Sequence, residues 1–196
     1  MESFFNIRRL YLREFSKVTF MLKKYRESVN YTRRLIKYSP KNPKLYFNLA
    51  VSHSLLNNNT EALKNYKKAI ELNPSFFAAY YNIGVIYQKN GFLEESLEYY
   101  QQALVIKPED AGLHYNLGLI YFEIQDYFQS LYYFMKAYQL DNSLKEAASN
   151  FEVIRNIKTL EKNVVKPLEL TVPSKVSLIF TFMMIIMTFL YFLKWV

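Results

Sequence analysis

The sequence predicts an all-α fold, a solenoid of stacked helical hairpins followed by one apolar helix near the carboxyl end. Three observations lead to this prediction. A residue pattern recurs every 34 positions, apolar residues inside each copy recur at helical spacing, and a stretch of 18 residues near the C-terminus carries no charge. The chain has 196 residues, of which 51% are apolar, and this is enough to build a core.

The repeated pattern occupies three consecutive segments. Residues 43–76, 77–110 and 111–144 align without a gap. Because the spacing is constant, one structural unit is expected to occur three times. In each copy an Asn is followed by Leu or Ile and then by a small residue: Asn48-Leu49-Ala50, Asn82-Ile83-Gly84 and Asn116-Leu117-Gly118.

Each copy is expected to fold as two antiparallel helices. Two apolar runs at helical spacing are separated by a short polar break, where Thr60 or Asp126 can cap the second helix. Pro74 and Pro108 close the first two copies, because proline interrupts a helix. Small residues should let the two backbones approach closely where the helices cross: Ala50, Gly84, Gly118, Ala62, Ser96, Ser130, Ala69, Ala103 and Ala137.

This helix-turn-helix pattern resembles the tetratricopeptide repeat (TPR) family, and the resemblance covers 102 of the 196 residues. Residues 1–42 fit the same frame weakly, and we interpret them as a degenerate fourth repeat; a plain amphipathic helix is the alternative. Residues 145–162 are expected to form a capping helix with a polar outer face, which repeat arrays need at their ends.

The positive charge is concentrated in the first segment. The whole chain has 25 Lys and Arg against 17 Asp and Glu, a formal net charge of +8, and residues 1–42 alone hold 11 basic and 3 acidic residues. Two interpretations of this basic segment are kept: a helix face exposed to solvent, and a surface that contacts anionic lipid. Nucleic acid is not expected, because no nucleic-acid-binding module is recognised. The absence of cysteine excludes disulfide bonds and thiolate metal sites.

An uncharged apolar stretch begins at Val176 and ends at Leu193. As a helix it would be about 27 Å long, close to the roughly 30 Å thickness of a hydrocarbon core. We therefore expect residues 176–193 to form a transmembrane helix in the lipid bilayer, with residues 163–175 as a tether. A buried helix of a soluble domain is the alternative.

The basic residues around this stretch predict its orientation. No N-terminal apolar run is long enough for a signal peptide, and more lysines precede the stretch than follow it. The positive-inside tendency then predicts a single-pass membrane protein with a C-terminal tail anchor and repeats that face the cytoplasm.

The sequence offers little for catalysis. His53 and His114 occupy positions where other copies have Tyr, so we interpret both as core residues. No glycine-rich phosphate loop occurs, and metal ligands are too few. The prediction is a non-enzyme with no catalytic, cofactor-binding or metal site.

In TPR proteins the first helix of each repeat lines a concave groove that binds peptides, and the resemblance implies the same role here. The recurring Asn can exchange hydrogen bonds with an extended backbone, and aromatic neighbours supply apolar contact; the alternative is that the Asn only stabilises the array. The cationic clamp of some family members is missing, so a neutral, aromatic groove is expected. The implied groove residues are Phe47, Asn48, Val51, Tyr81, Asn82, Val85, Tyr115, Asn116, Leu119 and Phe122.

The expected function is that of a membrane-anchored TPR scaffold or adaptor, which binds partner peptides in its groove and recruits or assembles proteins at a membrane. The alternative is a non-catalytic subunit of an integral-membrane complex, held mainly by its transmembrane helix.

Overall fold

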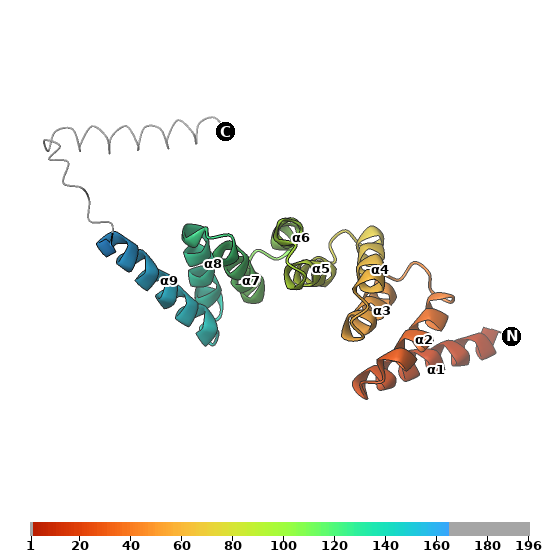
Figure 1. The fold of residues 1–196 in the computed structure, drawn as a ribbon. Coiled ribbons are helices and arrows are strands. Elements are labelled where there is room, and N and C mark those ends of the chain that lie inside the picture. The colour runs from red at the N-terminus through yellow and green to blue at the C-terminus, as the bar shows by residue number, and fades with distance from the viewer. Residues whose placement is uncertain (1, 165–196) are drawn as a thin grey trace, which may run out of the picture. The chain divides into compact units, whose positions relative to one another are not determined.

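The computed structural model describes residues 2–164; Met1 and residues 165–196 are outside the described part. Nine helices and no strand occur between residues 2 and 164 (Figure 1). The helices are α1 (Glu2–Met21), α2 (Tyr25–Ile36), α3 (Pro43–Leu55), α4 (Asn59–Leu72), α5 (Phe77–Lys89), α6 (Leu93–Ile106), α7 (Ala111–Glu123), α8 (Tyr127–Leu140) and α9 (Lys145–Val164).

The chain divides into two compact units, Met1–Glu152 and Val153–Val196. In the first unit each helix from α1 to α8 packs against the next one along the chain, so that successive pairs form antiparallel hairpins (Figure 1). This arrangement confirms the predicted all-helical solenoid. The expected transmembrane helix at residues 176–193 lies outside the described residues. Among the helices of residues 2–164, none is long and apolar enough to cross a bilayer.

Polar side chains cap the start of several helices. Asp126 accepts a hydrogen bond from the backbone N–H of Gln129 at 3.0 Å, as the sequence predicts. At the earlier break the prediction of Thr60 as a cap is wrong. Asn58 is the cap there, accepting from the N–H of Glu61 at 3.3 Å, because the left-handed backbone of Asn57 (φ +57°) starts the helix earlier.

The crossing points of two hairpins, α5 with α6 and α7 with α8, depend on the absence of a side chain. A Cβ added to Gly84 would lie 2.4 Å from the ring of Tyr100, and one added to Gly118 would lie 2.7 Å from the ring of Phe134. Such distances are far below van der Waals contact, so these glycines are required for the aromatic ring of the second helix to lie against the first.

A serine hydroxyl forms a hydrogen bond between the two helices at the same crossings. Ser96 donates to the carbonyl oxygen of Gly84 at 2.9 Å, twelve residues earlier, and Ser130 donates to that of Gly118 at 2.8 Å. The hairpin of α1 and α2 has the equivalent bond, from Ser28 to the carbonyl of Ser16 at 3.3 Å. The first hairpin therefore crosses as the repeats do, although α1, with 20 residues, is longer than the 13-residue first helices of the repeats.

Candidate functional site

A cavity of about 340 Å³ lies between α1 and α3. It brings together the three groove residues predicted from the first repeat, Phe47, Asn48 and Val51. The other walls come from the first hairpin. The complete lining is Ser16, Lys17, Phe20, Met21, Ser28, Phe47, Asn48 and Val51.

The hydroxyl groups in this wall are already paired within the protein. Ser16 shares a hydrogen bond of 2.7 Å with Thr32, and the hydroxyls of Ser28 and Ser52 lie 3.3 Å apart. All four residues are buried. Since these polar atoms are satisfied, what the wall offers a ligand is chiefly apolar surface.

The ring of Phe47 is held in place by its neighbours. It stacks on Phe76 with 5.1 Å between ring centroids and lies 5.6 Å from the ring of Tyr66. Tyr66 is buried, so the position of the Phe47 ring is set from behind by the core. A rigid aromatic wall loses little entropy when an apolar side chain packs on it.

Asn48 is the polar group available at this cavity. Its side chain is exposed, and its amide makes no hydrogen bond with any residue of the described part. It can therefore donate and accept one hydrogen bond each with a bound backbone. Lys17 is the one charged residue of the lining, and its ammonium lies 3.4 Å from the carboxylate of Glu14.

The third Asn of the series is used inside the protein. The amide of Asn116 donates to the hydroxyl of Tyr81 at 3.0 Å and to that of Tyr100 at 3.2 Å. Tyr100 in turn donates to Gln88 at 3.0 Å. Burial raises the pKa of the Tyr81 hydroxyl, and the charge of Asp110 raises it further against the lowering effect of the Asn116 hydrogen bond.

The residue 35 positions earlier decides whether an Asn has a partner. Asn150 follows the same rule as Asn116, since its amide donates to the hydroxyl of Tyr115 at 3.5 Å. For Asn82 the corresponding residue is Phe47, which has no hydroxyl. Nothing in residues 2–164 forms a hydrogen bond with the Asn82 amide. Asn48 and Asn82 are thus available to a ligand, whereas Asn116 links two hairpins.

The remaining predicted residues are spread along α5 and α7 and do not line the cavity. Tyr81 and Val85 pack against the buried core residues of α6 and α7, which include Tyr100, Leu113 and Leu117. Tyr115 lies 5.6 Å from the buried ring of Phe134, and Leu119 is half-buried. Phe122 is 39% exposed and contacts Tyr127.

The contribution of α1 was missed by the sequence analysis, which placed no groove residue in the first segment. The signal was present in the repeat frame, because Lys17 stands 34 positions before Val51 and so occupies the same position. The irregular sequence of α1 concealed it, since this helix lacks the Asn of the other copies.

Both histidines are buried, as expected for core residues. His53 contacts Arg33, with 3.4 Å between the ring nitrogen Nε2 and the guanidinium. Burial and the nearby charge of Arg33 lower the pKa of His53. His114 lies 2.7 Å from the carbonyl oxygen of Pro108 through its own Nε2. Within the described helices, no group of three acidic or histidine side chains is arranged to hold a metal ion.

Comparison with known proteins identifies the repeats. Residues 55–91 and 92–125 match a family described as "TPR repeat", and residues 111–144 match "Tetratricopeptide repeat". Tetratricopeptide repeats are therefore present in residues 55–144 of this chain. No curated protein sequence matches it.

Solved structures share the fold. MamA from Desulfovibrio magneticus RS-1 is 19% identical, with a TM-score of 0.65 over 78% of this chain and 96% of that one. PilF from Pseudomonas aeruginosa is 17% identical, with a TM-score of 0.69 over 79% of this chain and 70% of that one. YrrB, described as a TPR protein with an unusual peptide-binding site, is 22% identical, with a TM-score of 0.61 over 68% of this chain and 69% of that one. At these identities the likeness is one of fold alone.

Proposed function

Since the chain carries tetratricopeptide repeats, we propose that it is a protein-interaction scaffold that binds an extended peptide along the first helices of its hairpins, starting at the cavity between α1 and α3. The observation that carries this proposal is the cavity itself. It combines a fixed aromatic wall at Phe47 with the amide of Asn48, which has no hydrogen-bonding partner among the described residues. An apolar side chain of the peptide enters the cavity, and Asn48 pairs with the adjacent backbone.

The amide of Asn82 continues the same line. It lies one repeat further along, and in residues 2–164 it has no hydrogen-bonding partner either. Two amides and one apolar cavity suit a short extended segment with a large apolar residue near one end. YrrB has the same fold and a peptide-binding site, which supports the proposal at the level of the fold.

The second part of the proposal is location at a membrane. Residues 176–193 carry no charge over 18 positions, which is the length of a short transmembrane helix. A scaffold held by such a span meets its partners at a raised effective concentration, so modest affinity is sufficient. The alternative is a subunit of an integral-membrane complex in which this span makes the principal contact.

The groove is tested with the partner that proximity labelling by the full-length protein identifies. Affinity for that partner should fall about tenfold in Asn48→Ala and in Asn82→Ala, since each substitution removes hydrogen bonds to the bound backbone. Neither substitution should change the unfolding midpoint. Unchanged affinity in both variants, or a partner contacting only second helices, would reject the groove.

The membrane part is tested with Ile185→Arg, which places a charge at the middle of residues 176–193. Arg at the centre of a span costs about 2.5–3.5 kcal/mol on insertion scales. The native chain should remain with vesicles in alkaline flotation, and the variant should be released. Deleting residues 176–196 separates the two alternatives, because a scaffold keeps its soluble partner and a membrane-complex subunit loses its partner.

A further inference from the structure

The outward side of α1 is apolar and largely exposed, although Phe15 at its edge contacts the ring of Tyr31 on α2, with 5.6 Å between ring centroids. The opposite side of this helix is buried, with Leu12 1% exposed. By contrast, Met21 is 80% exposed and Ile7 is 65% exposed. The outer face of α1, as we name it, consists of Ile7, Leu10, Tyr11, Phe15, Val18 and Met21, all exposed, and the exposed Leu22 follows directly after the helix.

Such a face is unusual for a helix whose outward side is exposed to water. Exposed helix faces are normally polar, and single apolar residues on them are usually scattered. The six apolar residues recur at helical spacing between Ile7 and Met21, so they form one stripe rather than scattered single residues. A continuous apolar stripe of this kind indicates a binding surface.

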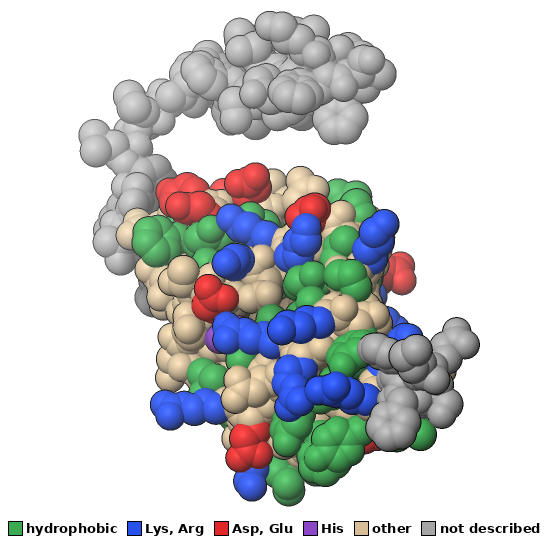
Figure 2. Space-filling view, turned by 90° about the vertical axis from the view of Figure 1, so that its right-hand side faces the viewer, with side chains coloured by type: hydrophobic (Ala, Val, Ile, Leu, Met, Phe, Trp, Pro, Cys, Tyr) green, Lys and Arg blue, Asp and Glu red, His purple; other side chains and the backbone are tan. Residues whose placement is uncertain are grey.

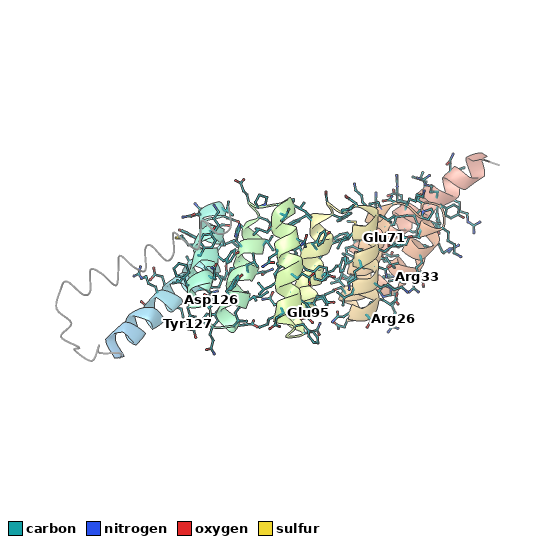
Figure 3. The ribbon with its side chains drawn as sticks, turned by 90° about the horizontal axis from the view of Figure 1, so that it is seen from above. Arg26, Arg33, Glu71, Glu95, Asp126 and Tyr127 are labelled. Carbon is teal, nitrogen blue, oxygen red and sulfur yellow. The ribbon has the colours of Figure 1, made fainter. Side chains whose placement is uncertain are left out.

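The helix that carries the stripe is basic, with Arg13 and Lys17 exposed beside the stripe. Arg26 and Arg33 are exposed on α2 (Figure 3), but they lie toward α3 and α4, where the Arg33 guanidinium is 3.4 Å from His53 and 3.9 Å from Glu61. Figure 2 views the molecule from the side of its N-terminal helices and shows Lys and Arg side chains gathered there, with hydrophobic side chains between them.

Glu14 is the one acidic residue between Asn6 and Met21, and it is neutralised in place. Arg13 donates to its carboxylate at 3.0 Å, and the Lys17 ammonium lies 3.4 Å away. This hydrogen bond and the charge of Lys17 lower the pKa of the Glu14 carboxyl. The outer face therefore meets its ligand with a net positive charge.

The combination of an apolar stripe with basic neighbours distinguishes between the possible binding partners of the outer face. A second copy docking through the same face would place two segments of formal charge +8 against each other, which repulsion disfavours. An apolar helical stripe flanked by Lys and Arg is the pattern of a helix that lies on an anionic bilayer, with its apolar side at the boundary of headgroups and acyl chains. The charged headgroups complement the basic flanks.

We propose that the outer face of α1 docks on an anionic membrane surface. Ile7, Val18 and Met21 enter the headgroup region, and Arg13 and Lys17 contact lipid phosphates. This inference takes the membrane location from the proposed function and does not depend on peptide binding. Since Lys17 and Met21 also line the cavity between α1 and α3, docking would place that cavity next to the lipid surface.

The experiment uses the absence of cysteine in the native chain. Full-length Val18→Cys is labelled with the fluorophore NBD and mixed with vesicles of phosphatidylcholine alone or of phosphatidylcholine and phosphatidylserine in equal parts. We expect a blue shift and quenching by lipid-borne nitroxide with the anionic vesicles only. The matched control is Val105→Cys on α6, which is 81% exposed and should not respond.

Charge is tested by replacing Arg13 and Lys17, the basic residues beside the outer face, together with Gln. Each basic residue near an anionic surface contributes about 1 kcal/mol, so the lipid concentration for half-maximal response should rise at least tenfold. Replacing the exposed Lys44 and Lys89 with Gln removes the same charge elsewhere and should leave the response unchanged. Salt at about 1 M, where the Debye length is about 3 Å, should abolish the response in the native background.

Flotation of the same samples distinguishes docking of α1 on the lipid surface from anchoring by the expected transmembrane span. Vesicles that float the protein while the Val18 label stays silent would overturn the docking of α1 and leave the span intact. A response of the Val18 label to an acidic peptide but not to anionic vesicles would assign the outer face to a protein partner instead. A response that is equal in both kinds of vesicle would reject the role of the basic residues.

Discussion

The side-chain amide of Asn116 on α7 donates a hydrogen bond of 3.0 Å to the hydroxyl of Tyr81 on α5, 35 positions earlier. The link joins the first helices of two consecutive hairpins. The pair Asn150 and Tyr115 repeats it one unit later. At the preceding junction Phe47 replaces the tyrosine, and the link is missing. One phenolic oxygen thus distinguishes a structural Asn from one that is free to bind.

Adding this oxygen should stabilise the protein. Phe47→Tyr places a hydroxyl at the position from which Tyr81 and Tyr115 accept, and Asn82 is the donor that it would meet. A gain of about 1 kcal/mol in the free energy of unfolding is expected. Chemical denaturation measures it. The gain should vanish in the Asn82→Ala background, and its persistence there would show that the two residues do not interact.

Removing the donor at the next junction should have the opposite effect. Asn116→Ala leaves the half-buried hydroxyl of Tyr81 and the buried Tyr100 without this partner, at a cost of about 1–2 kcal/mol in unfolding free energy. Asn48→Ala, at the same repeat position, should remain within about 0.5 kcal/mol of the native value, since its amide is exposed. Equal losses in the two variants would contradict the distinction between them.

The glycines at the hairpin crossings should not tolerate a methyl group. Gly84→Ala and Gly118→Ala push a Cβ into the rings of Tyr100 and Phe134, and each should cost about 1–3 kcal/mol of unfolding free energy. Gly112→Ala is the matched control, because its nearest neighbour would lie 3.5 Å away. Thermal unfolding followed by circular dichroism measures all three. A stable Gly84→Ala protein would be incompatible with the close crossing.

His53 should make stability depend on pH. Its pKa is lowered in the folded protein, by burial first and by Arg33 second, so the unfolded chain binds this proton more readily. The contribution of neutral His53 to the free energy of unfolding is complete above the pKa of about 6.5 that His has in the unfolded chain. This contribution is lost as the pH falls from there through the pKa of His53 in the folded protein. Unfolding free energy should therefore decrease between about pH 7 and pH 5. His53→Asn should have a flatter profile over this range, and an unchanged slope would exclude His53 as the cause.

The hairpins were predictable because their causes are local. Helical spacing of apolar residues, a break of two to four polar residues and a small residue at each crossing are all visible in residues 43–144. Asp126 was recognisable as a cap for the same reason. The cap at Asn58 was not, since four consecutive residues at that break, Asn57 to Thr60, are all of types that can cap a helix.

The site was less predictable, because it depends on which helices become neighbours. Phe47, Asn48 and Val51 follow from the repeat frame, but the wall that completes their cavity comes from α1. The unequal roles of the Asn residues require the pairing of positions 35 apart, which only the stacked helices reveal. The expected span at residues 176–193 lies beyond the described part and stays a prediction.

The serine-to-carbonyl bond and the ring-on-glycine contact of the second repeat both begin and end inside residues 77–110. A repeat of this design stabilises its own hairpin, so a tandem duplication of that segment would add a unit whose only new interface is that between α6 and the following copy of α5. The inserted Asn82 would face the Tyr81 of the copy before it. Growth by copying is thus open to this chain at its middle, because the contacts within a new hairpin are already encoded in one repeat.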